Sequence, residues 1–287
     1  MIWYLLFGIY NGRSLTFDFN GDFSYNTVSI ANNMSKFGEK LQRIYRGSTP
    51  AIGFRKTDEA EGAPLLIIAN LTKTSPTDAR ALAAAGIDAG ILSLKGVSAK
   101  SFAQLANAVD SIPLGLFPES ADKDMVAKAV DLGCDFVVFG LKTPLEAVNK
   151  KELGKVLKVE PSLEPGLVRA INGLPLSIDG VLVTADEPVI TVERLLIYQR
   201  FAELLDKPLL VTLGSMITAD ELSGLVEAGV NGLVLPEGLT PELFADLKKS
   251  VSGLSRTARR KTRATALLPR LGGEVEAEVE EEEEEDI

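Results

Sequence analysis

Three charged residues in the second half of the chain have side chains suited to acid, base or nucleophile chemistry. Lys158 and Glu160 alternate with apolar residues in the run 155–160, and Asp186 follows another apolar run. A lysine held away from water can attack a carbonyl carbon and form a Schiff base, and a nearby carboxylate can move the proton. We therefore predict that Lys158, Glu160 and Asp186 are catalytic. The chain has 0 His, which excludes Ser-His nucleophiles, His-ligated zinc and imidazole bases.

Further polar residues stand at the ends of other short apolar runs. Side chains alternate along a strand, so the apolar set marks one face and the polar set the other. We predict that these polar residues bind a substrate: Asn70, Ser93, Lys95, Lys142, Thr184, Thr212, Gly214 and Ser215. The alternative is a structural network in which Lys158 pairs with Glu160 or Asp186, while Lys95, Lys142 and Asp186 are solvated loop residues.

Eight apolar runs must position these residues, and they recur about every 24 residues between 64 and 253. They are nearly continuous in Val, Ile, Leu and Phe, which is typical of parallel strands covered on both faces. Between them, Ser75-Pro76 and Thr240-Pro241 are typical helix starts, and Gly86, Gly133 and Gly229 are typical helix ends. Eight strand-helix units predict a (β/α)8 TIM barrel. The alternative, an open doubly wound sheet, normally has fewer strands and a glycine turn after the first strand.

The late segment 208–222, with 229–236 after it, resembles the seventh and eighth strands of the aldolase-type, phosphate-binding TIM-barrel group. The resemblance covers roughly residues 64–250 and includes the glycine joints. It implies an active site at the carboxyl ends of the strands, and a phosphate at Gly214-Ser215 and at the turn after strand eight. That turn departs from the group, because Pro236-Glu237-Gly238 places a carboxylate there.

The group includes lyases, isomerases, synthases and flavin oxidoreductases, so the fold alone does not select a reaction. With the charged residues, the resemblance predicts a lyase or isomerase acting on a small carbonyl acid or sugar phosphate. An FMN-binding oxidoreductase is one alternative. A non-catalytic barrel that binds a protein partner through its charged tail is another. No spacing requires a metal, although Asp186, Glu187, Glu160 and Glu119 offer the oxygen ligands that Mg²⁺ prefers.

The two ends of the chain differ from the barrel segment. We predict that Met34 is the natural first residue, that 1–33 is an over-called start or a disordered extension, and that 34–63 forms a helix and lead-in. The apolar opening is too short for a membrane helix. With 1 Cys, no internal disulfide can form. We therefore expect a cytoplasmic protein.

At the other end, a basic linker at 254–273 precedes an acidic tail at 274–287. The tail holds 10 of the 40 acids, and the net charge of the whole chain is -10, so the rest is neutral. A run of like charges repels itself and buries nothing, so we expect a disordered tail. Its acids would compete with phosphates for the basic linker, which argues against nucleic acid as a partner.

Overall fold

The computed structural model describes only part of the chain. The described residues are 5–10, 13–17, 23–26, 35–46, 65–93, 98–117, 129, 131–148, 153–184 and 187–254. The chain divides into two compact units, 1–257 and 258–287. The second unit, with the predicted acidic tail, lies outside the described residues, as does the basic linker after residue 254.

The first unit includes a small antiparallel sheet near the start of the chain. Its strands are β1 (Leu5–Tyr10), β2 (Arg13–Phe17) and β3 (Phe23–Asn26), in the order β1-β2-β3. The sheet lies in the segment for which the sequence suggested an over-called start or a disordered extension. That the natural chain begins at Met34 stays a prediction.

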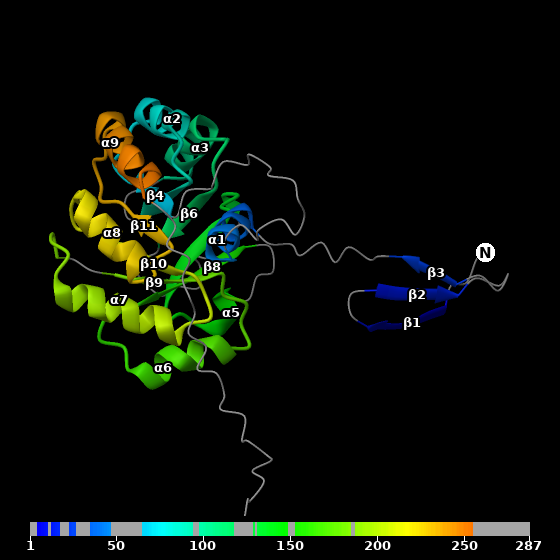
Figure 1. Ribbon diagram of the computed structural model, residues 1–287. Coiled ribbons are helices and arrows are strands. Elements are labelled where there is room, and N and C mark those ends of the chain that lie inside the picture. The colour runs from blue at the N-terminus through cyan, green and yellow to red at the C-terminus, as the bar shows by residue number, and fades with distance from the viewer. Residues whose placement is uncertain are drawn as a thin grey trace, which may run out of the picture. The chain divides into compact units, whose positions relative to one another are not determined.

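Residues 66–234 form a closed barrel of eight parallel strands, as the sequence predicted (Figure 1). The strands are β4 (Leu66–Asn70), β5 (Ala89–Ser93), β6 (Leu114–Phe117), β7 (Phe136–Gly140), β8 (Gly154–Val159), β9 (Gly180–Val183), β10 (Leu209–Thr212) and β11 (Gly232–Val234). Each pairs with its neighbour in sequence, and β11 pairs with β4, with Leu233 opposite Ile67. This last pairing closes the barrel and rules out the open sheet.

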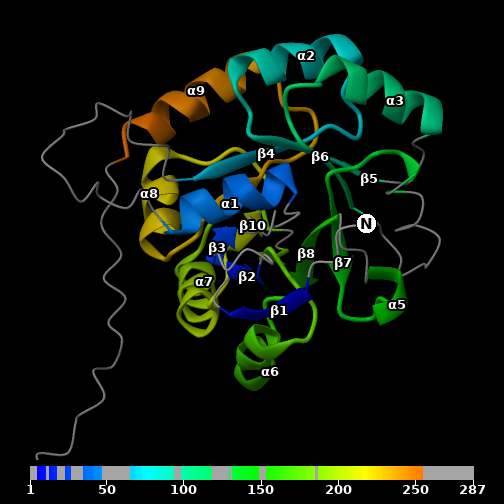
Figure 2. The same ribbon diagram turned by 90° about the vertical axis from the view of Figure 1, so that its right-hand side faces the viewer.

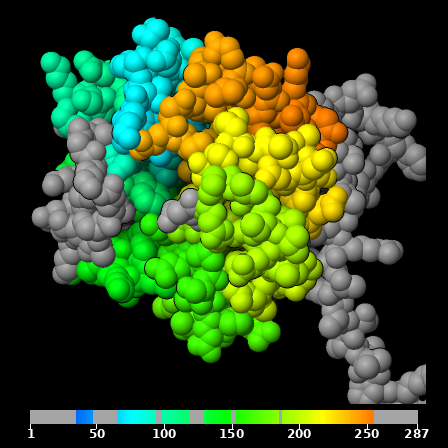
Figure 3. Space-filling model, turned by 90° about the vertical axis from the view of Figure 1, so that its left-hand side faces the viewer, coloured from blue at the N-terminus to red at the C-terminus, as the bar shows by residue number. Residues whose placement is uncertain are grey.

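Helices follow the strands around the outside. They are α2 (Pro76–Ala85), α3 (Ala99–Ala108), α5 (Leu145–Val148), α6 (Pro165–Ala170), α7 (Val192–Leu204), α8 (Ala219–Glu227) and α9 (Pro241–Ser252), with a short 3₁₀ turn η1 (Ile171–Gly173) after α6. Ser75 caps α2, and Gly86 ends it with a φ of 94°. The helices α7, α8 and α9 lie side by side (Figure 3). No described helix has both the length and the apolar character needed to cross a membrane.

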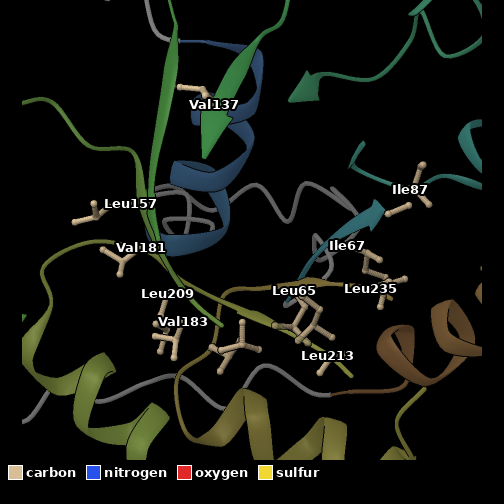
Figure 4. Close-up of a cluster of buried hydrophobic side chains, with 14 of the residues drawn as sticks. Leu65, Ile67, Ile87, Val137, Leu157, Val181, Val183, Leu209, Leu213 and Leu235 are labelled. Carbon is tan, nitrogen blue, oxygen red and sulfur yellow. The ribbon is translucent and has the colours of Figure 1, made fainter. Parts of the chain in front are cut away.

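Buried side chains form two layers separated by the wall of the barrel. The outer layer lies between strands and helices and includes Leu157 and Val181 (Figure 4). The inner layer fills the barrel and includes Val156 and Leu182. Neighbouring residues of one strand thus fall in different layers, as the alternation in the sequence predicted. Polar residues that continue the inner set, such as Lys158, therefore face the lumen.

The helix α1 (Lys36–Arg46) closes the end of the barrel at which the strands begin (Figure 2). The ring of Phe37 stacks on Phe136 with centroids 4.0 Å apart. Leu41 is fully buried among the inner residues. The strand β8 begins with Gly154, where a β-carbon would stand 2.8 Å from that of Phe136. Because the amino end is filled, a ligand must enter the barrel at the carboxyl end.

Every second strand of the barrel is preceded by an Asp or Asn, and three of these side chains accept a backbone N–H from the preceding strand. The pairs are Asp88 with Ile67 at 2.8 Å, Asp179 with Lys155 at 2.7 Å and Asn231 with Leu209 at 2.9 Å. In the equivalent place before β7, Asp135 instead accepts from Lys36 and Phe37 of α1. This two-strand period explains why the glycine joints of the sequence lie two and four units apart.

Candidate active site

A cavity of about 1080 Å³ lies at the carboxyl end of the barrel. This volume is typical of sites that bind small molecules. Its walls come from the ends of several strands and from one face of α7. Six of the residues predicted from the sequence line it: Asn70, Lys158, Glu160, Thr184, Thr212 and Gly214.

The other predicted residues are placed differently. Ser93 ends β5, and its backbone N–H donates to the hydroxyl of Thr72 at 2.9 Å. The Ser215 hydroxyl donates to the carbonyl oxygen of Pro188. Lys142 is exposed just after β7. None of these three is among the lining residues. Lys95, Asp186 and Glu119 lie outside the described residues.

Lys158 reaches the cavity from β8, where its neighbours in register are Gly140 on β7 and Leu182 on β9. Its ammonium group lies 4.8 Å from the centre of the Phe117 ring. A β-carbon on Gly140 would meet nothing within 4 Å, so there is open space at this position of β7. Within the described part of the chain, Lys158 makes no ion pair, so the structural pairing with Glu160 does not form.

Phe117 comes from the end of β6 and was not among the residues predicted from the sequence. Leu114 and Leu116 belong to the outer layer, so Phe117 falls on the inner face. The same rule that predicted Lys158 identifies it. Its ring gives the lysine an apolar surface with a favourable electrostatic contact.

Asn70 uses its side chain partly for local structure. Its carbonyl oxygen Oδ1 accepts hydrogen bonds from the backbone N–H of Thr72 at 3.1 Å and from the Thr72 hydroxyl at 2.6 Å. The side-chain N–H groups of Asn70 make no hydrogen bond within the described residues and remain donors for a ligand.

The helix α7 contributes residues that the sequence analysis missed. Glu193, Arg194, Ile197 and Arg200 line the cavity, at a spacing that places them along one side of the helix. Arg194 Nε donates to Glu187 Oε2 at 2.6 Å, and the Arg194 side chain is only 11% exposed. The hydrogen bond raises the pKa of Arg194, and the guanidinium lowers the pKa of Glu187.

Arg200 connects α7 to the loop after β8. Its Nη2 donates to the carbonyl oxygen of Pro161 at 2.9 Å. Its Nε is buried and has no hydrogen-bond partner among the described residues. A buried donor without a partner costs free energy, and no described residue offsets that cost at this atom.

Several enzymes of known structure share this arrangement of strands and helices. A tryptophan synthase from M. tuberculosis matches with a TM-score of 0.53, 13% identity, and coverage of 76% of this chain and 97% of that one. An orotidine 5'-phosphate decarboxylase from Pyrococcus horikoshii OT3 matches at 0.52 and 13%, covering 66% and 100%. An N-(5'-phosphoribosyl)anthranilate isomerase from Pyrococcus furiosus matches at 0.53 and 13%, with the same coverage.

This chain folds as a TIM barrel. The resemblance read from the sequence is therefore confirmed at the level of the fold. No protein-family model matches the chain, and no curated protein matches it.

In this TIM barrel the turn after the eighth strand holds an ion pair. Lys73, in the loop after β4, lies 2.6 Å from the Glu237 carboxylate, and Glu237 raises the pKa of Lys73. The next residue, Gly238, has a φ of 78°, which favours glycine. Neither Glu237 nor Gly238 is among the lining residues of the cavity.

The single cysteine of the chain, Cys134, lies just before β7, at the amino end of this TIM barrel. Cys134 is buried there, and burial raises the pKa of its thiol to about 12. This agrees with a packing role, because the thiolate is the reactive form. Within the described ranges, no three His, Cys, Asp or Glu side chains are grouped so that they could hold a metal ion.

Proposed function

We propose that this TIM barrel is a lyase or isomerase that acts on a small carbonyl compound carrying an acid group. Lys158 is the proposed nucleophile. The observation that carries the proposal is its placement in the cavity, against Phe117 and without a carboxylate partner in the described part of the chain. Lys158 is half-buried, and a lysine in a cavity with no carboxylate beside it among the described residues favours a functional role.

In the proposed reaction, the amine form of Lys158 adds to the carbonyl carbon through Nζ. The oxygen leaves as water with one proton from the amine and one from solvent, and the nitrogen keeps its other proton in a protonated Schiff base with the substrate. An adjacent C–C or C–H bond then breaks, and its electron pair moves toward the positive nitrogen. Glu160, which lines the same cavity, is the proposed acceptor of the released proton, with Asp186 as a second candidate.

The remaining polar residues of the cavity are proposed to orient the substrate. The Asn70 amide comes from the end of β4, the Thr212 hydroxyl from the end of β10, and the Thr184 hydroxyl from the residue after β9. Groups on rigid strand ends hold a substrate in a fixed geometry, which lowers the barrier by avoiding the cost of orientation. Gly214 lines the same cavity with its backbone.

An FMN-dependent reaction is not favoured by these residues. The resemblance implies that a phosphate would bind at the turns after the seventh and eighth strands. The first of these turns holds Ser215, whose hydroxyl is bonded to Pro188, and the second holds the carboxylate of Glu237. We therefore derive no step through a flavin.

Borohydride trapping tests the proposed function. The purified protein is incubated with keto acids, aldehydes and sugar phosphates, reduced, and mapped by peptide mass spectrometry. We expect one adduct, on Lys158, which the Lys158→Met variant loses. The variant Lys249→Met, on the exposed side of α9, serves as the control and should keep it. Adducts spread over exposed lysines, unchanged in Lys158→Met, would contradict the proposal.

A further inference from the structure

The cavity has two cationic groups on one wall besides Lys158. Arg194 and Arg200 both come from α7, and both line the cavity. Arg194 uses Nε for Glu187, and its terminal nitrogens Nη1 and Nη2 make no hydrogen bond to any described residue. Arg200 uses Nη2 for Pro161, and its buried Nε is left without a partner in the same part of the chain.

These two guanidinium groups are held in place while parts of them remain unused. The bond to Glu187 restrains Arg194 through one nitrogen and leaves the other end of its planar fork without a partner among the described residues. The bond to Pro161 restrains Arg200 through Nη2 and leaves Nη1 and the buried Nε without a hydrogen-bond partner among the described residues. Arginine recognises carboxylate and phosphate through two parallel N–H donors, and a restrained arginine loses less entropy when it binds.

We infer that Arg194 and Arg200 form an oxyanion site, which binds the carboxylate or phosphate group of the substrate against α7. The site differs from the turns after the seventh and eighth strands, where the resemblance placed a phosphate. There, the Ser215 hydroxyl already donates to Pro188, and the cation beside the turn after strand eight, Lys73, is already paired with Glu237. The arginine wall supplies two cations that can pair with an anion, besides Lys158.

Carboxylates also face this region and offset part of the positive charge of the arginines. Glu160, Glu187 and Glu193 line the same cavity. Glu187 is more exposed than its partner, with side-chain exposures of 56% and 11%, so water screens its charge more than that of Arg194. The deep, poorly solvated charge on this wall is therefore the positive one.

The inference rests on the proposed function only for the identity of the ligand as the substrate. A substrate that spans the cavity would place its acid group on α7 and its carbonyl carbon at Lys158. The anion site itself requires no Schiff base, so the two claims can fail separately.

Titration calorimetry with inorganic phosphate and with malonate, at constant ionic strength in chloride, tests the anion site. We expect the wild type to bind at least one of them. Arg194→Gln and Arg200→Gln should each bind it roughly tenfold to a hundredfold more weakly, as expected for a lost charge-assisted hydrogen bond. The control Arg80→Gln, on an exposed position of α2, should bind as the wild type does.

Two results would overturn the inference. One is the absence of phosphate and malonate binding in the folded wild type. The other is wild-type affinity in Arg194→Gln, which leaves the Arg200 contact to the β8 loop intact and is expected to fold. Trapping of the uncharged aldehyde glycolaldehyde separates the two proposals. The arginine variants should retain this adduct, while Lys158→Met should lose it and still bind the anion.

Discussion

The carboxylate of Asp135 accepts a hydrogen bond of 2.7 Å from the backbone N–H of Phe37. It also accepts one of 3.0 Å from Lys36, while the Ser35 hydroxyl accepts the N–H of Gly38. These N–H groups belong to the first turn of α1, where the helix itself provides no carbonyl oxygen to accept them. The contact fixes α1 to the start of β7 and holds the Phe37 ring against Phe136.

Replacing Asp135 by alanine should therefore loosen the closed end of the barrel. Two N–H groups of α1 lose their acceptor, and we expect the free energy of unfolding to fall by about 1–3 kcal/mol. Amide hydrogen exchange should rise first in α1. The control Asp131→Ala, at an exposed position nearby, should change neither quantity. Unchanged exchange in α1 of Asp135→Ala would show that packing alone holds the helix.

The substitution Asp88→Asn should stabilise the protein at neutral pH. Burial raises the pKa of Asp88, against the opposing effects of the Ile67 N–H and of Lys40 and Lys248. The folded state thus binds the Asp88 proton more tightly than the unfolded state, so this group lowers stability as pH rises from about 4 through the folded pKa. Asparagine retains the acceptor for Ile67 and removes the charge.

Urea unfolding at several pH values measures this effect. The advantage of Asp88→Asn should be small at pH 3, where the aspartate is protonated in both states, and should grow toward neutral pH. The reverse change is available in the same chain, because Asn231 occupies the equivalent position before β11. Asn231→Asp should lose stability over the same pH range. If the free energy of unfolding depended on pH in the same way in the wild type and both variants, this explanation would be wrong.

Gly154→Ala should destabilise the barrel. Its β-carbon would stand 2.8 Å from the β-carbon of Phe136, closer than two carbons can approach. Overpacking of this kind costs about 1–3 kcal/mol. Gly173→Ala is the matched control, because its β-carbon would meet nothing within 4 Å. Thermal unfolding of both variants measures the difference, and equal midpoints would show that α1 and β7 shift freely.

A larger side chain at Gly140 should block the site without harming the fold. The position faces open space and pairs in register with Lys158. We expect Gly140→Leu to lower the yield of the Lys158 adduct at least tenfold, because the leucine occupies space that a ligand needs. The melting temperature should stay within a few degrees of the wild type. Gly140→Ala adds one methyl group and should have a smaller effect on trapping.

The fold could be predicted because two features of the sequence identify each strand. One is its apolar run, and the other is its regular spacing from the neighbouring runs. The inward direction of Lys158, Thr184 and Thr212 followed from alternation, which has a period of two and holds wherever one face is apolar. Phe117 satisfies the same rule and could have been found. The confirmed part of the sequence analysis is therefore the part that depends on strand geometry.

The arginines of α7 could not be found in the same way. The helix exposes Val192 and Leu196 while it buries Tyr198 and Phe201, so apolar residues do not mark a single inner face. Ser215 is absent from the cavity lining for another reason. Its motif predicts a turn at the right strand, but a local hydrogen bond to Pro188 decides what the hydroxyl does. Contacts between loops are not encoded by any periodicity.

The pairing of β4 with β11 joins the first and last strands of the barrel. Across the same junction, Lys248 of α9 donates to the carbonyl oxygen of Ala85, which is 163 residues away in sequence. Every other strand pair in the barrel joins neighbours along the chain. Bringing distant segments together costs more chain entropy than joining near ones, and it slows folding. We expect this junction to form last when the protein folds from denaturant, so a half-folded barrel would be an open, curved sheet with β4 and β11 as its two free edges.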